Sequence, residues 1–246
     1  MSKIKILSGE NENEKILREE FLKLYSEASI TNNEIIQNIG LFINRMNLSR
    51  ILFMQDLYLK IIEVHGIIIE FGVRWGQNMS LYSNLRGIYE PFNYNRKIVG
   101  FDTFQGFPKV DSKDGKKIKA GDYNVTKNYE LYLEKVLAYH ESESPINHKR
   151  KFELIKGDAT KTFKQYLTNN PETIIAFAYF DIYKPTKICL ELLMERVTKG
   201  LVIAFDELNC HDFPGETIAV METLGLKKYA IKRSPLNPLI SYITIE

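Results

Sequence analysis

Acidic residues at the ends of buried apolar runs are the side chains of this sequence that could do chemistry. Four such runs, each typical of a strand, end in a carboxylate: Glu70, Asp102, Asp181 and Asp206. Ligands of open α/β sheets bind outside the carboxyl ends of the strands, so these acids are expected to meet at one rim. A carboxylate there can accept a hydrogen bond from a hydroxyl, hold a cation, or act as a general base. Stability alone is a poor explanation for four acids on one rim, and the pattern therefore predicts a functional site.

A glycine-containing turn follows the first of these acids. Residues 67–69 are three consecutive isoleucines, which is typical of a central parallel strand covered on both faces. After Glu70 the chain turns through Gly72 and Gly76, and glycine lets a backbone approach a ligand closely because it has no Cβ. This spacing differs from the Gly-x-Gly-x-x-Gly pattern of dinucleotide-binding proteins. An acid directly before such a turn resembles the first motif of S-adenosylmethionine-dependent methyltransferases; an ordinary β–α turn is the alternative.

The elements that must position these residues alternate along the chain. Predicted strands, some with their turns, occupy residues 67–70, 96–102, 152–160, 173–180 and 201–205, and a terminal hairpin occupies residues 229–232 and 241–245. Helices are predicted between them, including one over residues 129–140. This alternation predicts an α/β fold with a mostly parallel sheet.

The first part of the chain differs from the rest. Apolar residues recur at helical spacing through residues 14–62, which predicts a helical preface without strands. We therefore divide the chain into an N-terminal helical segment, residues 1–62, and an α/β domain, residues 63–246. This N-terminal helical segment is expected to cover the sheet edge, to close over a substrate, or to form the contact of a homodimer. The alternative is that its helices only pack on the α/β domain.

Composition excludes several classes of protein. The chain has 246 residues, of which 44% are hydrophobic and 26% charged, as is ordinary for a globular protein. Its formal net charge of +2 argues against a protein that binds nucleic acid by neutralising phosphates. No apolar run approaches the roughly 20 residues that span a bilayer, no signal-peptide core is present, and two cysteines are too few for a disulfide framework. We predict a cytoplasmic protein that acts on a small molecule, without nucleic acid or membrane partners.

Two further segments leave alternatives open. The polar residues 109–124 predict a loop or a mobile lid. Asp158 follows a predicted strand and could contact a ligand, or it could cap the helix that begins near Thr160. Asp181 has a similar alternative role as the cap of the helix that begins near residues 185–186.

Four motifs in register resemble the macrocin O-methyltransferase family. They are Glu-Phe-Gly-Val at 70–73, Phe-Asp-Thr-Phe-Gln-Gly-Phe-Pro at 101–108, Asp-Ile-Tyr-Lys-Pro-Thr at 181–186 and Phe-Asp-Glu at 205–207. The resemblance runs from about residue 50 to the C-terminus. That family comprises class I S-adenosylmethionine-dependent enzymes that act largely on sugar hydroxyls. It implies a Rossmann-like, seven-stranded, mostly parallel sheet with helices on both faces and one antiparallel strand near the end.

The resemblance also implies roles for individual residues. Glu70, Gly72 and Gly76 would line the methionine part of S-adenosylmethionine, Asp102 would bind the ribose, and Asp158 would lie by the adenine. Asp181 would be the general base that removes the proton of a sugar hydroxyl. Apart from the resemblance, His211 is the alternative base if Asp181 serves as a helix cap.

The metal site of that family is altered in this sequence. The family carries an acid two positions before the proposed base, and Tyr179 stands there. Its acidic pair after the next strand corresponds to Asp206 and Glu207, which remain as candidate ligands for a divalent metal such as magnesium. Three carboxylates suit a hard cation, and two carboxylates with a phenol suit it less well, so we predict weak or absent magnesium dependence.

The sequence thus favours an S-adenosylmethionine-dependent O-methyltransferase acting on a sugar or related hydroxyl. A non-catalytic cofactor-binding protein with a degenerate metal site is the alternative, and Tyr179 is the feature that favours it. An NAD-dependent enzyme is disfavoured by the glycine spacing. The acceptor could be a sugar, a nucleotide-sugar or a phosphorylated metabolite.

Overall fold

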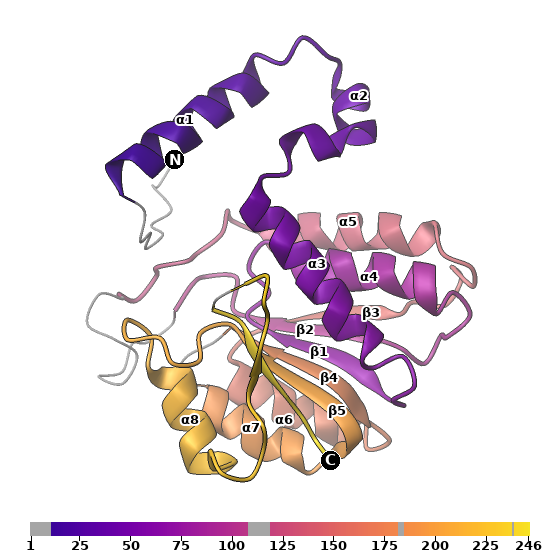
Figure 1. The fold of residues 1–246 in the computed structure, drawn as a ribbon. Coiled ribbons are helices and arrows are strands. Elements are labelled where there is room, and N and C mark those ends of the chain that lie inside the picture. The colour runs from indigo at the N-terminus through magenta and orange to yellow at the C-terminus, as the bar shows by residue number, and fades with distance from the viewer. Residues whose placement is uncertain (1–10, 108–118, 182–184, 238) are drawn as a thin grey trace.

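A seven-stranded sheet forms the centre of the protein (Figure 1). The computed structural model describes residues 11–107, 119–181, 185–237 and 239–246. The strand order is β3-β2-β1-β4-β5-β7-β6. The strands are β1 (Ile67–Phe71), β2 (Ile98–Asp102), β3 (Phe152–Lys156), β4 (Ile175–Phe180), β5 (Val197–Phe205), β6 (Lys232–Arg233) and β7 (Ser241–Thr244).

The pairing of the strands confirms the predicted fold class. β1, β2, β3, β4 and β5 pair in parallel, and β7 runs antiparallel to both of its neighbours, β5 and β6. The bounds of two elements differ from the prediction. β5 begins at Val197 because that residue already pairs with Ile175 of β4. β6 is only two residues long, since it is an exposed edge strand that pairs with β7 alone.

Helices cover both faces of the sheet (Figure 1). The helices of the described chain are α1 (Glu12–Ser26), α2 (Asn32–Gln37), the 3-10 helix η1 (Ile39–Phe42), α3 (Arg45–Leu59), α4 (Gln77–Tyr89), α5 (Tyr129–Ser142), α6 (Ala159–Asn169), α7 (Thr186–Met194) and α8 (Gly215–Thr223). Those from α3 onward pack on the sheet. One apolar cluster joins Ile68 of β1 to helices α3, α4 and α5. The other joins Ile69 to α6, α7 and α8. Successive strand residues point to opposite faces, so a strand covered on both faces must be apolar throughout.

The N-terminal helical segment is helical in its described part, as predicted, but it has two distinct parts. The first three helices within the described residues, α1, α2 and η1, contain no buried residue and extend away from the body (Figure 1). α3 instead packs on the sheet through Phe53, Met54, Leu57 and Tyr58. Whether the preceding helices contact a second copy of the chain, or close over a substrate, stays a prediction, as does the domain boundary at residue 62.

Two sequence predictions concern residues at or beyond the limits of the described chain. Most of the predicted lid lies outside the described residues, since residues 108–118 are not described. The same holds for residues 182–184 of the third motif. Among the described residues, no helix combines the length and the apolar character that crossing a bilayer requires.

Candidate active site

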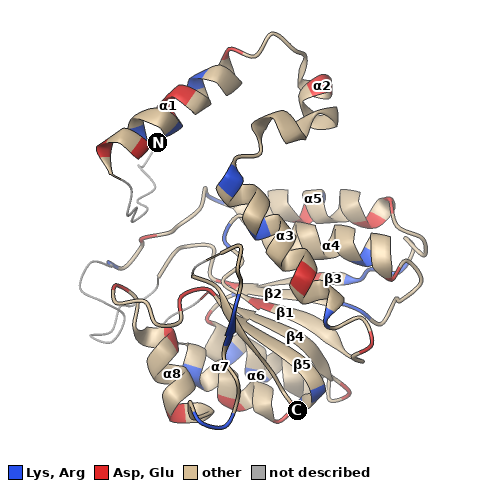
Figure 2. Cartoon of the chain, in the orientation of Figure 1, with Lys and Arg blue, Asp and Glu red and all other residues tan. Residues whose placement is uncertain are grey.

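The carboxyl ends of the central strands open into a cavity of about 1280 Å³. All four acids that end predicted strands line this cavity: Glu70, Asp102, Asp181 and Asp206. In Figure 2, red acidic segments lie on β1 and on the loop that connects β5 to α8. Ligand sites of proteins usually have volumes of about 300–1,000 Å³, so this cavity has room for a nucleoside-sized cofactor together with a second molecule.

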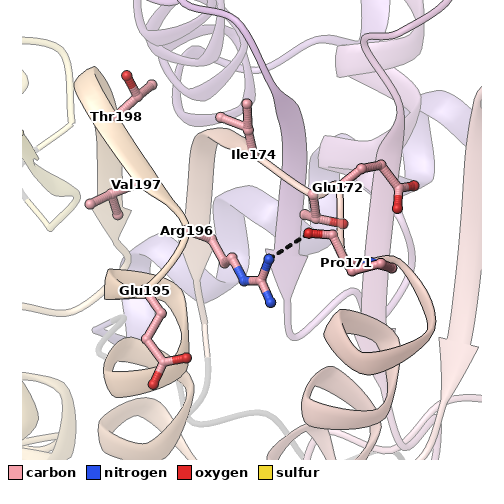
Figure 3. Close-up of a pocket in the computed structure, with 8 residues that line it drawn as sticks. Pro171, Glu172, Ile174, Glu195, Arg196, Val197 and Thr198 are labelled. Atoms are coloured by element: carbon pink, nitrogen blue, oxygen red, sulfur yellow. Dashed lines mark hydrogen bonds between the residues drawn. The ribbon is translucent and has the colours of Figure 1, made fainter.

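A second hollow lies at the opposite end of the same sheet (Figure 3). It has a volume of about 410 Å³ and is lined by residues 171–174 and 195–198, at the amino ends of β4 and β5. Nη1 of Arg196 donates a hydrogen bond of 2.7 Å to the carbonyl oxygen of Pro171 across it. Because ligands of such sheets bind at the carboxyl ends of the strands, the larger cavity is the candidate active site.

The glycine turn after β1 brings only one of its two glycines to the cavity. Gly72 lines the cavity and has a φ of 90°, a conformation that favours glycine. Gly76 also has a positive φ, but it caps α4 and is not among the lining residues. A Cβ at Gly76 would lie 2.4 Å from Cδ1 of Leu133 on α5. The close packing of α4 and α5 therefore explains the glycine at position 76 without a ligand.

Two ionisable side chains of this turn have buried atoms without a partner. Glu70 is 2% exposed, and its Oε1 accepts a hydrogen bond of 2.9 Å from Nδ2 of Asn78. Among the described residues, Oε2 of Glu70 and Nε and Nη2 of Arg74 are buried and have no hydrogen-bond partner. The Arg74 guanidinium stacks on Tyr123, 5.0 Å from the ring centroid. Buried polar atoms nearly always have a hydrogen-bond partner in folded proteins. A carboxyl oxygen and guanidinium nitrogens without partners on one cavity therefore indicate a ligand that carries both a positive and a negative group.

The Glu70 carboxyl gives a pH-dependent prediction for the ligand-free protein. Burial raises its pKa to about 8, although the hydrogen bond from Asn78 opposes this effect. The folded state then binds this proton more tightly than the unfolded state, so the free energy of unfolding should fall as pH rises from about 5 to 8. In wild type, we expect the free energy of unfolding to decrease by on the order of a few kcal/mol between these two pH values because of this carboxyl. The Glu70→Gln variant should lack this decrease. Denaturant unfolding of both proteins at the two pH values measures it. Parallel pH dependences of the two proteins would contradict the assignment.

Asp102 connects the turns that follow β1 and β2. Its Oδ2 accepts a hydrogen bond of 2.7 Å from the main-chain N–H of Arg74, and its Oδ1 accepts one of 2.6 Å from that of Phe104. Burial raises its pKa, although these main-chain donors act in the opposite direction. Each carboxylate oxygen has two lone pairs, so the side chain can still accept hydrogen bonds from a ligand.

Asp158 caps α6 and also lines the cavity. Its Oδ1 accepts a hydrogen bond of 3.0 Å from the main-chain N–H of Thr160 and one of 2.8 Å from the hydroxyl of the same residue. The capping alternative is thus confirmed. Contact with a ligand is compatible with it and stays a prediction.

Asp181 lies directly after β4 and lines the cavity. The cap position of α7 is Pro185, so Asp181 is not the cap residue of that helix. Whether its carboxyl contacts the first turn of α7 stays a prediction. Burial raises the pKa of Asp181 well above its usual value, and the negative charges of Asp206 and Glu207 raise it further. A carboxylate with a raised pKa is a stronger base than an ordinary one, as proton removal from a hydroxyl requires.

A cluster around Arg50 was not predicted from the sequence. Arg50 of α3 donates from Nη1 to Oδ1 of Asp206 at 3.1 Å and from Nη2 to the hydroxyl oxygen of Tyr179 at 2.8 Å. Its Nε lies 3.4 Å from Oδ1 of Asn78, and the Tyr179 hydroxyl donates to Oδ1 of Asp206. A signal was present, since Arg50 precedes the buried residue Phe53 by three positions and therefore lies on the buried face of α3.

The residues present at this rim do not fit a divalent metal. Tyr179 takes the place of one acid, and Oδ1 of Asp206 already accepts hydrogen bonds from Arg50 and Tyr179. Glu207 is held through its main-chain N–H, which donates to the buried carboxylate of Glu216 at 2.9 Å. No group of three or more His, Cys, Asp or Glu residues suited to a metal occurs in the described part of the chain. Arg50 therefore competes with a cation for Oδ1 of Asp206, and the assignment of Asp206 and Glu207 as metal ligands stays a prediction that these contacts do not favour.

His211, the alternative base, lies apart from this constellation. It is exposed in the bend that precedes α8 and is not among the residues that line the cavity. The structure thus brings Asp181 to the cavity and leaves His211 outside it.

Comparison with known proteins gives close structural relatives. The chain is similar to the crystal structure of CalS11, a calicheamicin methyltransferase, with 37% identity over 99% of this chain and 97% of that chain and a TM-score of 0.92. The apo structure of CalS11, described as a TDP-rhamnose 3'-O-methyltransferase, matches with 36% identity over 97% of this chain and 96% of that chain and a TM-score of 0.85. The O-methyltransferase NovP, at 17% identity over 80% of this chain and 79% of that chain and a TM-score of 0.56, shares the fold. No protein-family model matches the sequence, and a search of curated proteins gives no match.

Proposed function

Because the chain belongs to the S-adenosylmethionine-dependent O-methyltransferases, we propose that it methylates a hydroxyl group of a hexose, and that the hexose is carried by a nucleoside diphosphate. CalS11, which is similar over nearly the whole chain, is described as acting on TDP-rhamnose. The four sequence motifs support the further proposal that it is an enzyme of the macrocin type. The volume of the cavity supports a cofactor and a substrate bound side by side.

S-adenosylmethionine fits the side chains around the glycine turn. Its methionine part carries an ammonium and a carboxylate, which match the unpaired oxygen of Glu70 and the unpaired nitrogens of Arg74. Gly72 would let the backbone lie close to this part. Asp102 would accept hydrogen bonds from the ribose hydroxyls, and Asp158 would lie beside the adenine. The cofactor would supply a methyl group already activated by the positive charge on sulfur.

Asp181 carries the chemical part of the proposal. Asp181 is half-buried and lines the same cavity as the glycine turn, and its carboxyl has a raised pKa. The carboxylate would accept the proton of the bound hydroxyl while the hydroxyl oxygen forms its bond to the methyl carbon. The electron pair of the broken carbon–sulfur bond would remain on sulfur. The protein thus supplies orientation and proton removal.

Ligand binding and product analysis test this function directly. We expect calorimetry to show binding of S-adenosylmethionine and S-adenosylhomocysteine and no binding of NAD. Incubation with hexose nucleotides should then give a product whose mass increases by one methylene unit. Cofactor binding without methyl transfer to sugars, nucleotide-sugars or phosphorylated sugars would instead favour the non-catalytic alternative, and NAD binding would contradict the cofactor assignment.

A further inference from the structure

We propose that the guanidinium of Arg50 is the fixed cation of the active site, which binds the oxygen that receives the methyl group and makes the reaction independent of a divalent metal. The inference rests on the proposed function and extends it to a residue outside the four sequence motifs. It is carried by the cluster of Arg50, Tyr179 and Asp206 at the rim of the cavity.

The guanidinium is held firmly in place. Its carrier, α3, is anchored in the core by residues on the same helical face, among them Phe53 and Met54. Its partners come from three other elements: Asn78 from α4, Tyr179 from β4 and Asp206 from the end of β5. A cation fixed in this way needs little reorganisation when negative charge develops on a substrate.

Arg50 retains the capacity to bind a ligand. A guanidinium has five N–H donors. Within the described residues, three of them donate: one each to Asp206, Tyr179 and Asn78. The side chain is 24% exposed and lines the cavity. In the proposal, the two remaining N–H groups serve the ligand bound there. A planar guanidinium also keeps its charge at every pH at which the protein is folded.

The same contacts exclude a metal from this place. The neutral hydroxyl of Tyr179 donates a hydrogen bond to Asp206 and accepts one from Arg50. A divalent cation at Oδ1 of Asp206 would have to displace these donors and would also face the positive charge of Arg50. Tyr179 in place of an acid and Arg50 beside it therefore act together. The Arg50 guanidinium takes the place of a bound metal ion.

The proposed chemistry places Arg50 and Asp181 on the same substrate hydroxyl. Asp181 removes the proton, the oxygen forms its bond to the methyl carbon, and the carbon–sulfur bond breaks with its electron pair left on sulfur. Negative charge on the oxygen is greatest while the proton leaves, and the guanidinium stabilises it. Arg50 also reduces the repulsion between Asp181 and the neighbouring acids Asp206 and Glu207, since its positive charge lowers the pKa of Asp181 against the raising effects of burial and of those acids.

Two variants at position 50 test the catalytic part. Arg50→Met retains length and loses charge, and we expect kcat to fall about 10²–10³-fold with a smaller change in KM and unchanged affinity for S-adenosylhomocysteine. Arg50→Lys restores a positive charge and should recover part of kcat. Arg150→Met, which removes an exposed arginine that pairs with Glu134, is the matched control and should keep wild-type turnover. A kcat of Arg50→Met within about threefold of wild type would overturn the catalytic role.

Metal binding tests the replacement independently of turnover. Wild type should keep its activity in the presence of a chelator, and titration followed by electron paramagnetic resonance should show no bound Mn²⁺. The double variant Arg50→Ala with Tyr179→Asp should gain Mn²⁺ binding, whereas Tyr179→Asp alone should not, because Arg50 would pair with the new acid. A thermal unfolding curve confirms that each variant folds.

The outcomes separate the two proposals. Mn²⁺ bound by the wild type, or activity lost with chelator and restored by Mg²⁺, would overturn the role of Arg50 and leave the methyltransferase function intact. Failure of the wild type to transfer a methyl group to any acceptor would overturn the proposed function, and the Mn²⁺ titration would still decide whether Arg50 excludes a metal.

Discussion

Asp181→Asn should bind S-adenosylmethionine with normal affinity and lose about 10²–10⁴-fold in turnover. The substitution preserves the shape of the side chain and removes its ability to accept a proton. The structure supports this expectation in two ways: Asp181 lines the cavity, and the cap position of α7 is Pro185 instead. Burial and the acids Asp206 and Glu207 raise its pKa, so the wild-type turnover should increase with pH as this carboxyl loses its proton.

A matched acid at the other end of the sheet provides the control. Glu172, which is labelled in Figure 3, lies just before β4. Asp181 lies just after the same strand. Glu172→Gln removes one negative charge from the same strand region, far from the cavity, and should leave turnover unchanged. Single-turnover rates of the two variants, measured with saturating cofactor, compare them directly. Near-normal turnover in Asp181→Asn would mean that another group removes the proton.

Gly72→Val should abolish detectable binding of S-adenosylmethionine, with an affinity loss of more than about 100-fold. Gly72 lines the cavity at the turn that holds the unpaired groups of Glu70 and Arg74. A side chain at this position adds atoms where the backbone is expected to meet the cofactor. Calorimetry on the folded variant measures the effect, and unchanged affinity would remove the central assignment of the cofactor site.

Backbone strain must be separated from loss of ligand space in this experiment. Gly72 has a φ of 90°, so valine is strained there whether or not a ligand binds. Gly225 has a φ of 73°, and a Cβ added to it would meet no atom within 4 Å. Gly225→Val therefore carries a comparable strain after α8, away from the cavity. It should lower the melting temperature by a similar amount and leave cofactor binding unchanged.

Local patterns in the sequence were sufficient to predict the fold. Three isoleucines at 67–69 predicted a strand covered on both faces, and the structure buries Ile68 and Ile69 in two different apolar clusters. The hairpin near the C-terminus was predicted as two strands of similar length. Only its second strand is well formed, because β6 is exposed and has a single neighbour.

The site could be predicted only in part. Acids at the ends of parallel strands must meet at one rim, and Glu70, Asp102, Asp181 and Asp206 do so. The pattern could not separate the two glycines of the turn, because the Leu133 side chain that fills the space beside Gly76 comes from α5, more than fifty residues later. It also could not decide between capping and ligand contact for Asp158 and Asp181, since both roles use the same residue type in the same place.

The sequence by itself determined the sheet, its helices and the strand ends that carry the acids, because these depend on periodicity and on turn residues that are local in the chain. Only the tertiary structure decided which residues form hydrogen bonds with the acids of the site. Arg50 meets Tyr179 and Asp206 across separations of 129 and 156 residues, and no local pattern encodes such a contact. The physical reason is that a buried charge must find its partner wherever the fold brings one. In this protein, the packing of α3 on the sheet supplies that partner.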